Sequence, residues 1–146
     1  MNAETSPPIG ADTAPTFLRD LWYMASLADT LAPGQMRREI LLGEPVVIGR
    51  MRDGKVFALR DICPHRGVPL SAGRVMDENT LECPYHGWRF RADGVCSLIP
   101  SLVEADDMDA SRIKVRAYSV REQDGLIWVF MPAPGHETNV PQIEPL

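Results

Sequence analysis

The sequence predicts an all-β protein, built as a sandwich or a barrel of short strands. Short runs rich in β-branched and aromatic residues recur along the chain, and turn signals such as Asp53-Gly54, Asp93-Gly94 and Asp124-Gly125 separate them. No long helical period interrupts this series, and no repeat is visible beyond two matched loops that carry cysteine and histidine. Many short strands joined by turns are typical of a sandwich or a barrel.

The folded domain is expected to span residues 17–131. Residues 1–16 predict a flexible tail, and residues 132–146 predict a Pro-rich exit segment with no further element. One helical turn is expected over 17–21, and the acidic residues Glu104, Asp106, Asp107 and Asp109 predict a solvated loop. Strands are expected over 35–42, 45–51, 55–60, 74–76, 80–82, 89–90, 95–98, 115–122 and 126–131.

Composition narrows the classes of function. A chain of 146 residues fits one domain, and its formal net charge of −5 argues against a nucleic-acid-binding protein. Three cysteines cannot make a disulfide framework, and Cys96, which lies outside the two loops, is predicted to be an inert buried thiol. No run approaches about 18 apolar residues and no signal peptide is visible, so we expect no membrane association and a cytoplasmic protein.

Two short loops carry the residues with the most chemistry. The first reads Cys63-Pro64-His65-Arg66-Gly67, and the second reads Cys83-Pro84-Tyr85-His86-Gly87-Trp88. Each loop offers one thiolate and one imidazole, which suit zinc or an iron–sulfur cluster and do not suit magnesium or calcium. Each cysteine is followed by a proline that stiffens the loop, and each histidine is followed closely by a glycine that leaves room for a bulky group. We therefore expect both loops to hold one metal centre.

The paired loops closely resemble the signature of Rieske [2Fe-2S] domains. That resemblance implies that Cys63 and Cys83 bind one iron, and that His65 and His86 bind the other. On an oxidised core, two thiolates and two neutral imidazoles leave no net charge, whereas four thiolates leave a negative charge, so an added electron costs less here. A structural zinc site is the alternative, although Cys-x-His is a tight spacing for zinc.

Further segments resemble the N-terminal Rieske domain of aromatic-ring-hydroxylating oxygenases, with the nearest likeness to monooxygenases of the vanillate O-demethylase type. These segments are Leu21-Trp22-Tyr23, Asp61-Ile62-Cys63, Pro69-Leu70-Ser71, Gly94-Val95-Cys96, Val120-Arg121-Glu122 and Leu126-Ile127-Trp128-Val129. The resemblance implies an antiparallel β-sandwich or barrel with a small cluster-binding sub-domain. It also implies partners: an NAD(P)H-dependent reductase or a ferredoxin as electron donor, a catalytic oxygenase domain as acceptor, and a homo-oligomer in the full oxygenase.

Two departures separate the chain from respiratory Rieske proteins, which tie their loops with a disulfide. The matching positions here are Val68 and Tyr85. Respiratory proteins also place a serine where this chain has Trp88, which has no hydroxyl to donate to a cluster sulfur. Because fewer donors stabilise the reduced cluster less, we expect a potential toward the low end of the Rieske range.

Three residues flank the predicted ligands: Arg66, Tyr85 and Trp88. They are expected to lie beside the cluster or at the surface that meets a partner. Trp88 is either an interface aromatic or part of the local packing. Arg66 is expected to pair with an acid of the partner or with its own loop.

The catalytic half of such an oxygenase is absent from the sequence. A mononuclear oxygenase iron needs two histidines and a carboxylate, but His136 is the one histidine outside the loops, and we expect it to be solvated. The chain is therefore expected to transfer electrons to an oxygenase site supplied elsewhere. A free-standing Rieske-type ferredoxin is the first alternative, and a zinc-stabilised binding module is the second.

Overall fold

The structure, a computed structural model, describes residues 16–102 and 107–146. The strands in these ranges are β1 (Leu21–Leu27), β2 (Met36–Leu41), β3 (Glu44–Arg50), β4 (Val56–Arg60), β5 (Arg74–Val75), β6 (Thr80–Glu82), β7 (Arg89–Arg91), β8 (Cys96–Leu98), β9 (Val120–Gln123) and β10 (Leu126–Met131). Three single-turn 3-10 helices join them: η1 (Ala28–Thr30), η2 (Leu70–Ala72) and η3 (Ala110–Arg112). None of these helices has the length and apolar character needed to span a membrane.

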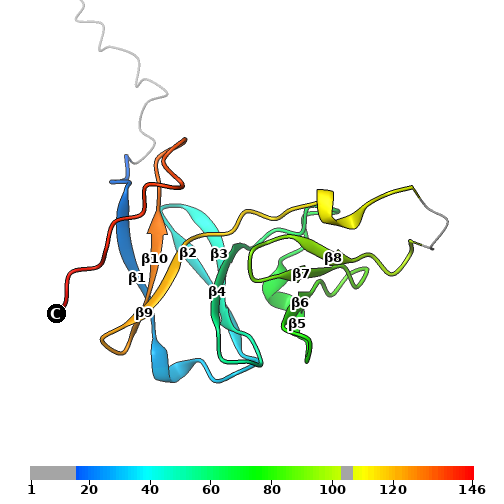
Figure 1. The fold of residues 1–146 in the computed structure, drawn as a ribbon, viewed down its shortest axis with the longest axis horizontal. Coiled ribbons are helices and arrows are strands. Elements are labelled where there is room, and N and C mark those ends of the chain that lie inside the picture. Colours follow the sequence, from blue (N-terminus) through cyan, green and yellow to red (C-terminus); the bar gives the residue numbers. More distant parts are fainter. Residues whose placement is uncertain (1–15, 103–106) are drawn as a thin grey trace, which may run out of the picture.

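Three sheets make up the described part of the chain (Figure 1). Sheet A has the strand order β1-β10-β9, sheet B has β2-β3-β4, and sheet C has β5-β6-β7-β8. Their strands pair antiparallel throughout, so the predicted antiparallel all-β fold is confirmed. Figure 1 shows sheets A and B at one end of the molecule and sheet C beside them as a small sub-domain. The first cysteine–histidine loop follows β4, and the second joins β6 to β7.

Strands β3 and β4 of sheet B are buried on both of their faces. Successive side chains on a strand point to opposite faces, so Val46 packs in a buried cluster with sheet A, whereas Val47 packs in a second cluster with the two loops. In β4 the same alternation sends Ala58 toward sheet A and Phe57 toward the loops. A strand covered on both sides reads as a continuous apolar run, which accounts for Val46-Val47-Ile48 in the sequence.

The predicted strand over 115–122 is wrong in its extent, because only its last part joins sheet A as β9. Before β9 the chain crosses from sheet C to sheet B, and it makes one isolated bridge to each of them. Lys114 bridges to Val95 and Ala117 bridges to Leu59. A segment whose hydrogen bonds go to two different sheets cannot form one continuous ladder. The other predicted strands are present with ends that shift by at most one residue.

The predicted helical turn over 17–21 is also wrong, and β1 is a strand that the sequence analysis did not predict. Asp20 has a φ of 62°, and its N–H donates to the Met131 carbonyl (2.8 Å). Its carboxylate accepts a 2.8 Å hydrogen bond from the Ala133 N–H. The chain therefore enters sheet A through bonds to the end of β10, which leaves no helical i to i−4 ladder to form.

Parts of two predictions lie outside the described residues. These are residues 1–15 of the expected tail and the acids Glu104 and Asp106 of the expected solvated loop. The other two acids of that loop, Asp107 and Asp109, are exposed and lie outside any helix or strand. Asp109 accepts a 3.0 Å hydrogen bond from the Ser111 N–H, which caps η3.

Residues 132–146 have no helix or strand, but they fold back along sheet A (Figure 1). The Trp22 indole N–H donates to the Pro141 carbonyl (2.8 Å), and the Gln123 side chain donates to the Ile143 carbonyl (3.3 Å). His136 is exposed and makes a 2.8 Å contact with the Asp20 carboxylate. This segment therefore covers part of the outer face of sheet A.

A buried tyrosine lies at the end of the crossing segment. The Tyr118 hydroxyl donates a 3.0 Å hydrogen bond to Glu44, a residue of β3. Burial, and then the bond to Glu44, raises the pKa of Tyr118 from 10.0 to about 12. Because the pKa is higher in the folded state, the neutral hydroxyl stabilises the fold fully below the unfolded pKa, and this stabilisation is lost as pH rises through the folded pKa.

The first prediction follows from the raised pKa of Tyr118. We expect the free energy of unfolding of the wild type to fall by up to about 2–3 kcal/mol relative to Tyr118→Phe between about pH 10 and about pH 12. Denaturant unfolding of both proteins over this range measures the difference. Two curves that stay parallel across the range would contradict the role given to Tyr118.

Candidate metal centre

The first loop is closed by two backbone hydrogen bonds that begin and end at its cysteine. The Cys63 N–H donates to the Val68 carbonyl (2.8 Å), and the Gly67 N–H donates to the Cys63 carbonyl (2.8 Å). The second loop repeats both bonds at the same offsets, from Cys83 N–H to the Trp88 carbonyl (2.8 Å) and from Gly87 N–H to the Cys83 carbonyl (3.1 Å). The two loops are therefore copies of one closed backbone shape.

Glycine is needed at the same point of both copies. Gly67 has a φ of 75° and Gly87 has a φ of 71°, in the left-handed region that a side chain disfavours. The turn after each predicted ligand pair thus depends on a residue without a Cβ. The sequence predicted that these glycines make room for a bulky group, and their positive φ adds a conformational reason for them.

The two histidine rings meet at the surface. Nδ1 of His65 lies 3.1 Å from Nδ1 of His86, and the ring centroids are 4.8 Å apart. Desolvation, followed by the neighbouring charges of His86 and Arg66, lowers the pKa of His65. This favours the neutral ring, which is the form that binds a metal. The structure therefore brings one nitrogen of each ring to the same point.

The two cysteines are buried beneath the histidines, in the cluster that also packs against sheet B. Burial, opposed by the backbone N–H groups of His65 and Arg66 and reinforced by the adjacent Cys83 thiol, raises the pKa of Cys63 to about 11. The Cys63 thiol would thus stay protonated without a metal, and a metal would displace its proton. The backbone N–H groups that point at the Cys63 sulfur suit the negative charge of a thiolate.

The donor set fits a two-iron cluster by its chemistry. Two sulfurs face each other on the buried side, and two imidazole nitrogens face each other on the exposed side. The sulfur pair and the nitrogen pair match the ligands of a cluster that has two thiolates on one iron and two imidazoles on the other. Within 16–102 and 107–146, no three His, Cys, Asp or Glu side chains form a group suited to a single metal ion.

A buried carboxylate fixes the start of the first loop. Asp61 is 0% exposed and accepts hydrogen bonds from the Ser71 N–H (2.7 Å) and the Ser71 hydroxyl (2.6 Å). It also accepts a 3.0 Å hydrogen bond from the Arg38 guanidinium of β2. Asp61 therefore joins both ends of the first loop to sheet B. The sequence did not predict this role, and its one local signal is an acid that directly follows the β4 run.

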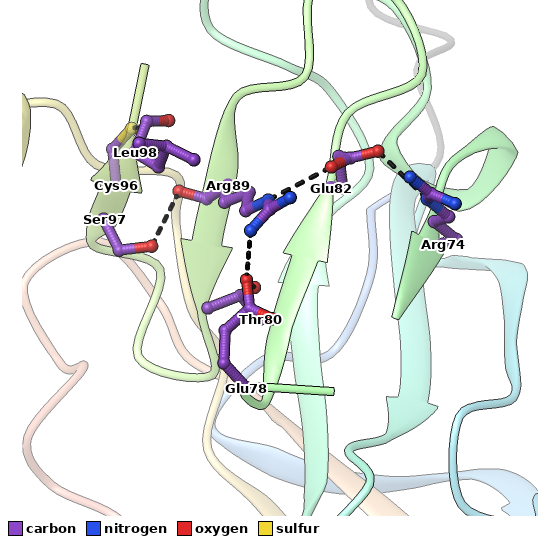
Figure 2. A network of polar contacts seen from close by, with 8 residues as sticks. All are labelled: Arg74, Glu78, Thr80, Glu82, Arg89, Cys96, Ser97 and Leu98. Atoms are coloured by element: carbon purple, nitrogen blue, oxygen red, sulfur yellow. Dashed lines mark hydrogen bonds and ion pairs between the residues drawn. The ribbon is translucent and has the colours of Figure 1, made fainter. Parts of the chain in front are cut away.

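Charged side chains clamp the base of the second loop (Figure 2). Glu82, the last residue of β6, accepts from Arg74 Nε (3.0 Å) and from Arg89 Nε (3.1 Å). Arg89, the first residue of β7, also pairs with Glu78, as Figure 2 shows. Cys83 follows Glu82 directly. This network of ion pairs therefore holds β6 and β7 together where the second loop leaves the sheet. In the sequence this network is signalled by acids at 78 and 82 that lie between basic residues at 74 and 89.

The three flanking residues occupy different places around the histidines. The Trp88 ring stacks on the His65 ring, with centroids 4.4 Å apart and planes 8° apart. The Tyr85 ring lies against His86 at 4.0 Å and 51°, and this tyrosine is 58% exposed. Arg66 is exposed, and its side chain has no hydrogen bond or ion pair with another residue of the described ranges. Trp88 thus packs locally against the predicted ligands.

The third cysteine stands apart from this centre. Cys96 lies in β8 and is buried, as the sequence predicted. Burial raises the pKa of its thiol, which favours the unreactive protonated form.

Comparison with known proteins matches residues 21–119 to the Rieske [2Fe-2S] domain family. The chain is 39% identical to the 3-chlorobenzoate-3,4-dioxygenase oxygenase subunit of Comamonas testosteroni over 130 residues, which are 88% of this chain and 30% of that protein. It is 40% identical to the oxygenase component of dicamba O-demethylase of Stenotrophomonas maltophilia over 115 residues, or 79% of this chain and 32% of that protein.

Solved structures show the same likeness. The crystal structure of apo dicamba monooxygenase matches with a TM-score of 0.76 and 36% identity, covering 89% of this chain and 38% of that one. The oxygenase in the reduced oxygenase–ferredoxin complex of carbazole 1,9a-dioxygenase matches with a TM-score of 0.69 and 32% identity, covering 79% and 29%. The chain thus spans about a third of the length of these relatives.

The second prediction concerns the buried carboxylate. Asp61→Asn removes the charge that pairs with Arg38 and replaces one acceptor oxygen by a donor, so we expect a loss of about 2–3 kcal/mol in the free energy of unfolding. The control is Asp29→Asn, which changes an exposed acid of η1 and should stay within about 0.5 kcal/mol of the wild type. Denaturant unfolding of the three proteins makes the comparison. Equal losses in both variants would show that Asp61 has no special structural role.

The third prediction concerns the ion pairs of Glu82 at the base of the second loop. Glu82→Gln weakens the bonds to Arg74 and Arg89, and we expect it to cost about 1–2 kcal/mol at low salt and less at high salt. Unfolding at two salt concentrations measures this, with Glu144→Gln, an exposed acid of the C-terminal segment, as the control. A cost that does not change with salt would rule out an ionic clamp.

Proposed function

This chain belongs to the Rieske [2Fe-2S] domain family, and we propose that it is the electron-transfer domain of an aromatic-ring-hydroxylating oxygenase whose catalytic iron lies outside these 146 residues. The observation that carries the proposal is the pairing of donors by two matched loops, with sulfurs buried and imidazoles exposed. The relatives named above are oxygenase subunits, which favours this function over a free-standing ferredoxin. The family match favours a [2Fe-2S] cluster over a zinc site.

We assign the ligands by the two pairs. The sulfurs of Cys63 and Cys83 would hold one iron, and the Nδ1 atoms of His65 and His86, which face each other, would hold the other. When bound, the cluster supplies the uptake and release of one electron. The loop backbone keeps the sulfurs inside, and Asp61 and Glu82 fix the bases of the two loops.

The exposed histidine edge is the surface through which we propose that electrons leave. With Nδ1 turned toward the shared point, the Nε2 side of each ring is left for solvent or a partner, and both residues are exposed. The polar ring edges of His65 and His86 and the exposed Tyr85 are the groups that an acceptor domain would meet. Electron transfer is favoured there because no buried protein separates the imidazoles from the acceptor.

The partners follow from the family. A reductase that uses NAD(P)H, or a ferredoxin, would deliver the electron, and the solved oxygenase–ferredoxin complex of a relative supports this. The acceptor would be a catalytic oxygenase domain, on the same or a neighbouring subunit of a homo-oligomer. The chain has three histidines, and with two assigned to the cluster only His136 remains, so the acceptor iron requires histidines from elsewhere.

Two finer assignments belong to this proposal. The O-demethylase among the relatives supports the narrower resemblance to the vanillate O-demethylase type, which stays a prediction. We place the function in the cytoplasm because none of the three cysteines is in a disulfide, as expected in a reducing compartment. The domain is proposed to cover residues 17–131, with 1–16 as a tail and 132–146 as an exit segment.

The fourth prediction tests the cluster and its electron transfer together. The purified protein should contain two irons and two labile sulfides per chain and give a Rieske-type paramagnetic resonance signal when reduced. His86→Cys should lower the reduction potential, because a thiolate adds negative charge to the cluster. Voltammetry and metal analysis measure both. Zinc at one per chain without visible absorption, or an unchanged potential in a cluster-bearing His86→Cys protein, would overturn the assignment.

The matched activity control uses the same protein with a reductase and NAD(P)H. The reduced signal should appear, whereas no aromatic substrate should be hydroxylated or demethylated. Turnover by this chain alone would overturn the assignment of the oxygenase iron to a separate segment.

A further inference from the structure

We propose that Trp88 is a positioning residue for His65, and that its stacked indole ties the first loop to the second without a covalent bond. This inference rests on the proposed function, because it concerns a ring that would hold iron. It starts from the match between the two loops. Their closing hydrogen bonds place Val68 and Trp88 at equivalent positions, five residues after the cysteine of each loop.

The match between the loops does not extend to the histidines. His65 is the second residue after its cysteine, so its equivalent in the other loop is Tyr85. His86 is the third residue after its cysteine, and its equivalent is Arg66. The two rings therefore approach their common point from unlike backbone positions. The shared loop shape cannot orient both rings, and each ring needs a support of its own.

His65 has little support from hydrogen bonds. A metal-bound histidine is usually oriented by a hydrogen bond from its other ring nitrogen to a carboxylate or carbonyl. In the described ranges the only hydrogen bond of the His65 ring joins its Nδ1 to His86. The residue is also exposed, so close packing on all sides does not hold it either. The flat contact with Trp88, at 4.4 Å and 8°, is what limits rotation of the ring.

Trp88 is itself held firmly enough to act as that support. Its carbonyl accepts the 2.8 Å hydrogen bond from the Cys83 N–H that closes the second loop. Its side chain is half-buried and packs against the buried cluster that contains both cysteines. The indole thus connects the core, the second loop and the imidazole of the first loop. Tyr85, by contrast, is 58% exposed and meets His86 at 51°, so it offers no comparable anchor.

In the described ranges, no disulfide joins the two loops. Val68 and Tyr85, one from each loop, carry no thiol, and none of the three cysteines of the chain is in a disulfide. The contacts of His65 with His86 and with Trp88 both cross from one loop to the other. Loss of the indole would therefore release the first loop and widen the range of His65 ring orientations.

The test compares cluster-bearing wild type with Trp88→Leu, Trp88→Phe and the control Trp22→Leu. Trp22 is a half-buried tryptophan of β1 that contacts Phe130 of sheet A, away from the loops. We expect Trp88→Leu to release iron to a chelator about 2- to 10-fold faster, which corresponds to about 0.4–1.4 kcal/mol, and to broaden the paramagnetic resonance signal of the reduced cluster. Trp88→Phe keeps a flat ring and should restore most of the signal shape, and Trp22→Leu should leave the signal unchanged.

The outcomes separate this inference from the proposed function. A wild type without a Rieske signal overturns both. A normal wild type together with an unchanged release rate and signal in Trp88→Leu overturns only the role of Trp88. If Trp88→Leu binds no cluster, Trp88→Phe decides: a signal and release rate near those of the wild type support the stack, and a loss equal to that of Trp88→Leu shows that ring stacking is not the cause.

Discussion

The hydrogen bond from each cysteine N–H to the carbonyl five residues later is the constraint on which the candidate site depends. It closes a short loop so that the cysteine side chain turns into the core while the residues between remain at the surface. Made twice, from Cys63 and from Cys83, it delivers two sulfurs to one buried place and two imidazoles to one exposed place. The division between a buried thiolate pair and an exposed imidazole pair is thus a property of backbone geometry.

Sheet B provides the rigid support for that geometry. Because β3 and β4 are buried on both faces, one face packs against sheet A and the other against the cluster that contains the cysteines. Polar groups then fix the loops laterally, with Asp61 joining the first loop to β2 and Glu82 joining the strands on either side of the second loop. Apolar burial places the loops, and charged pairs at their bases limit how far they can shift.

The sequence indicated the proposed ligands but not their surroundings. Cys63, His65, Cys83 and His86 stand out as candidate ligands because both loops repeat a thiolate and an imidazole, donors that zinc and iron–sulfur centres prefer, and this signal is local. The contacts of Asp61 with Ser71 and of Trp88 with His65 join residues 10 and 23 positions apart, and no local pattern encodes such pairs. The two wrong elements have a similar cause. The helical turn over 17–21 and the long strand over 115–122 were judged on local propensity, but their hydrogen bonds go to β10 and to two different sheets.

The sequence by itself therefore determined the fold class, the order of most strands and the candidate donor residues. Alternation of apolar residues, turn dipeptides and side-chain chemistry are all properties of short segments. Only the tertiary structure decided which nitrogen of each imidazole faces the shared point, that Asp61 is a buried anchor and that Trp88 covers the face of His65. These features depend on the relative placement of two loops, and that placement is set by how sheets B and C pack together, a relation between distant segments that short-range patterns do not contain.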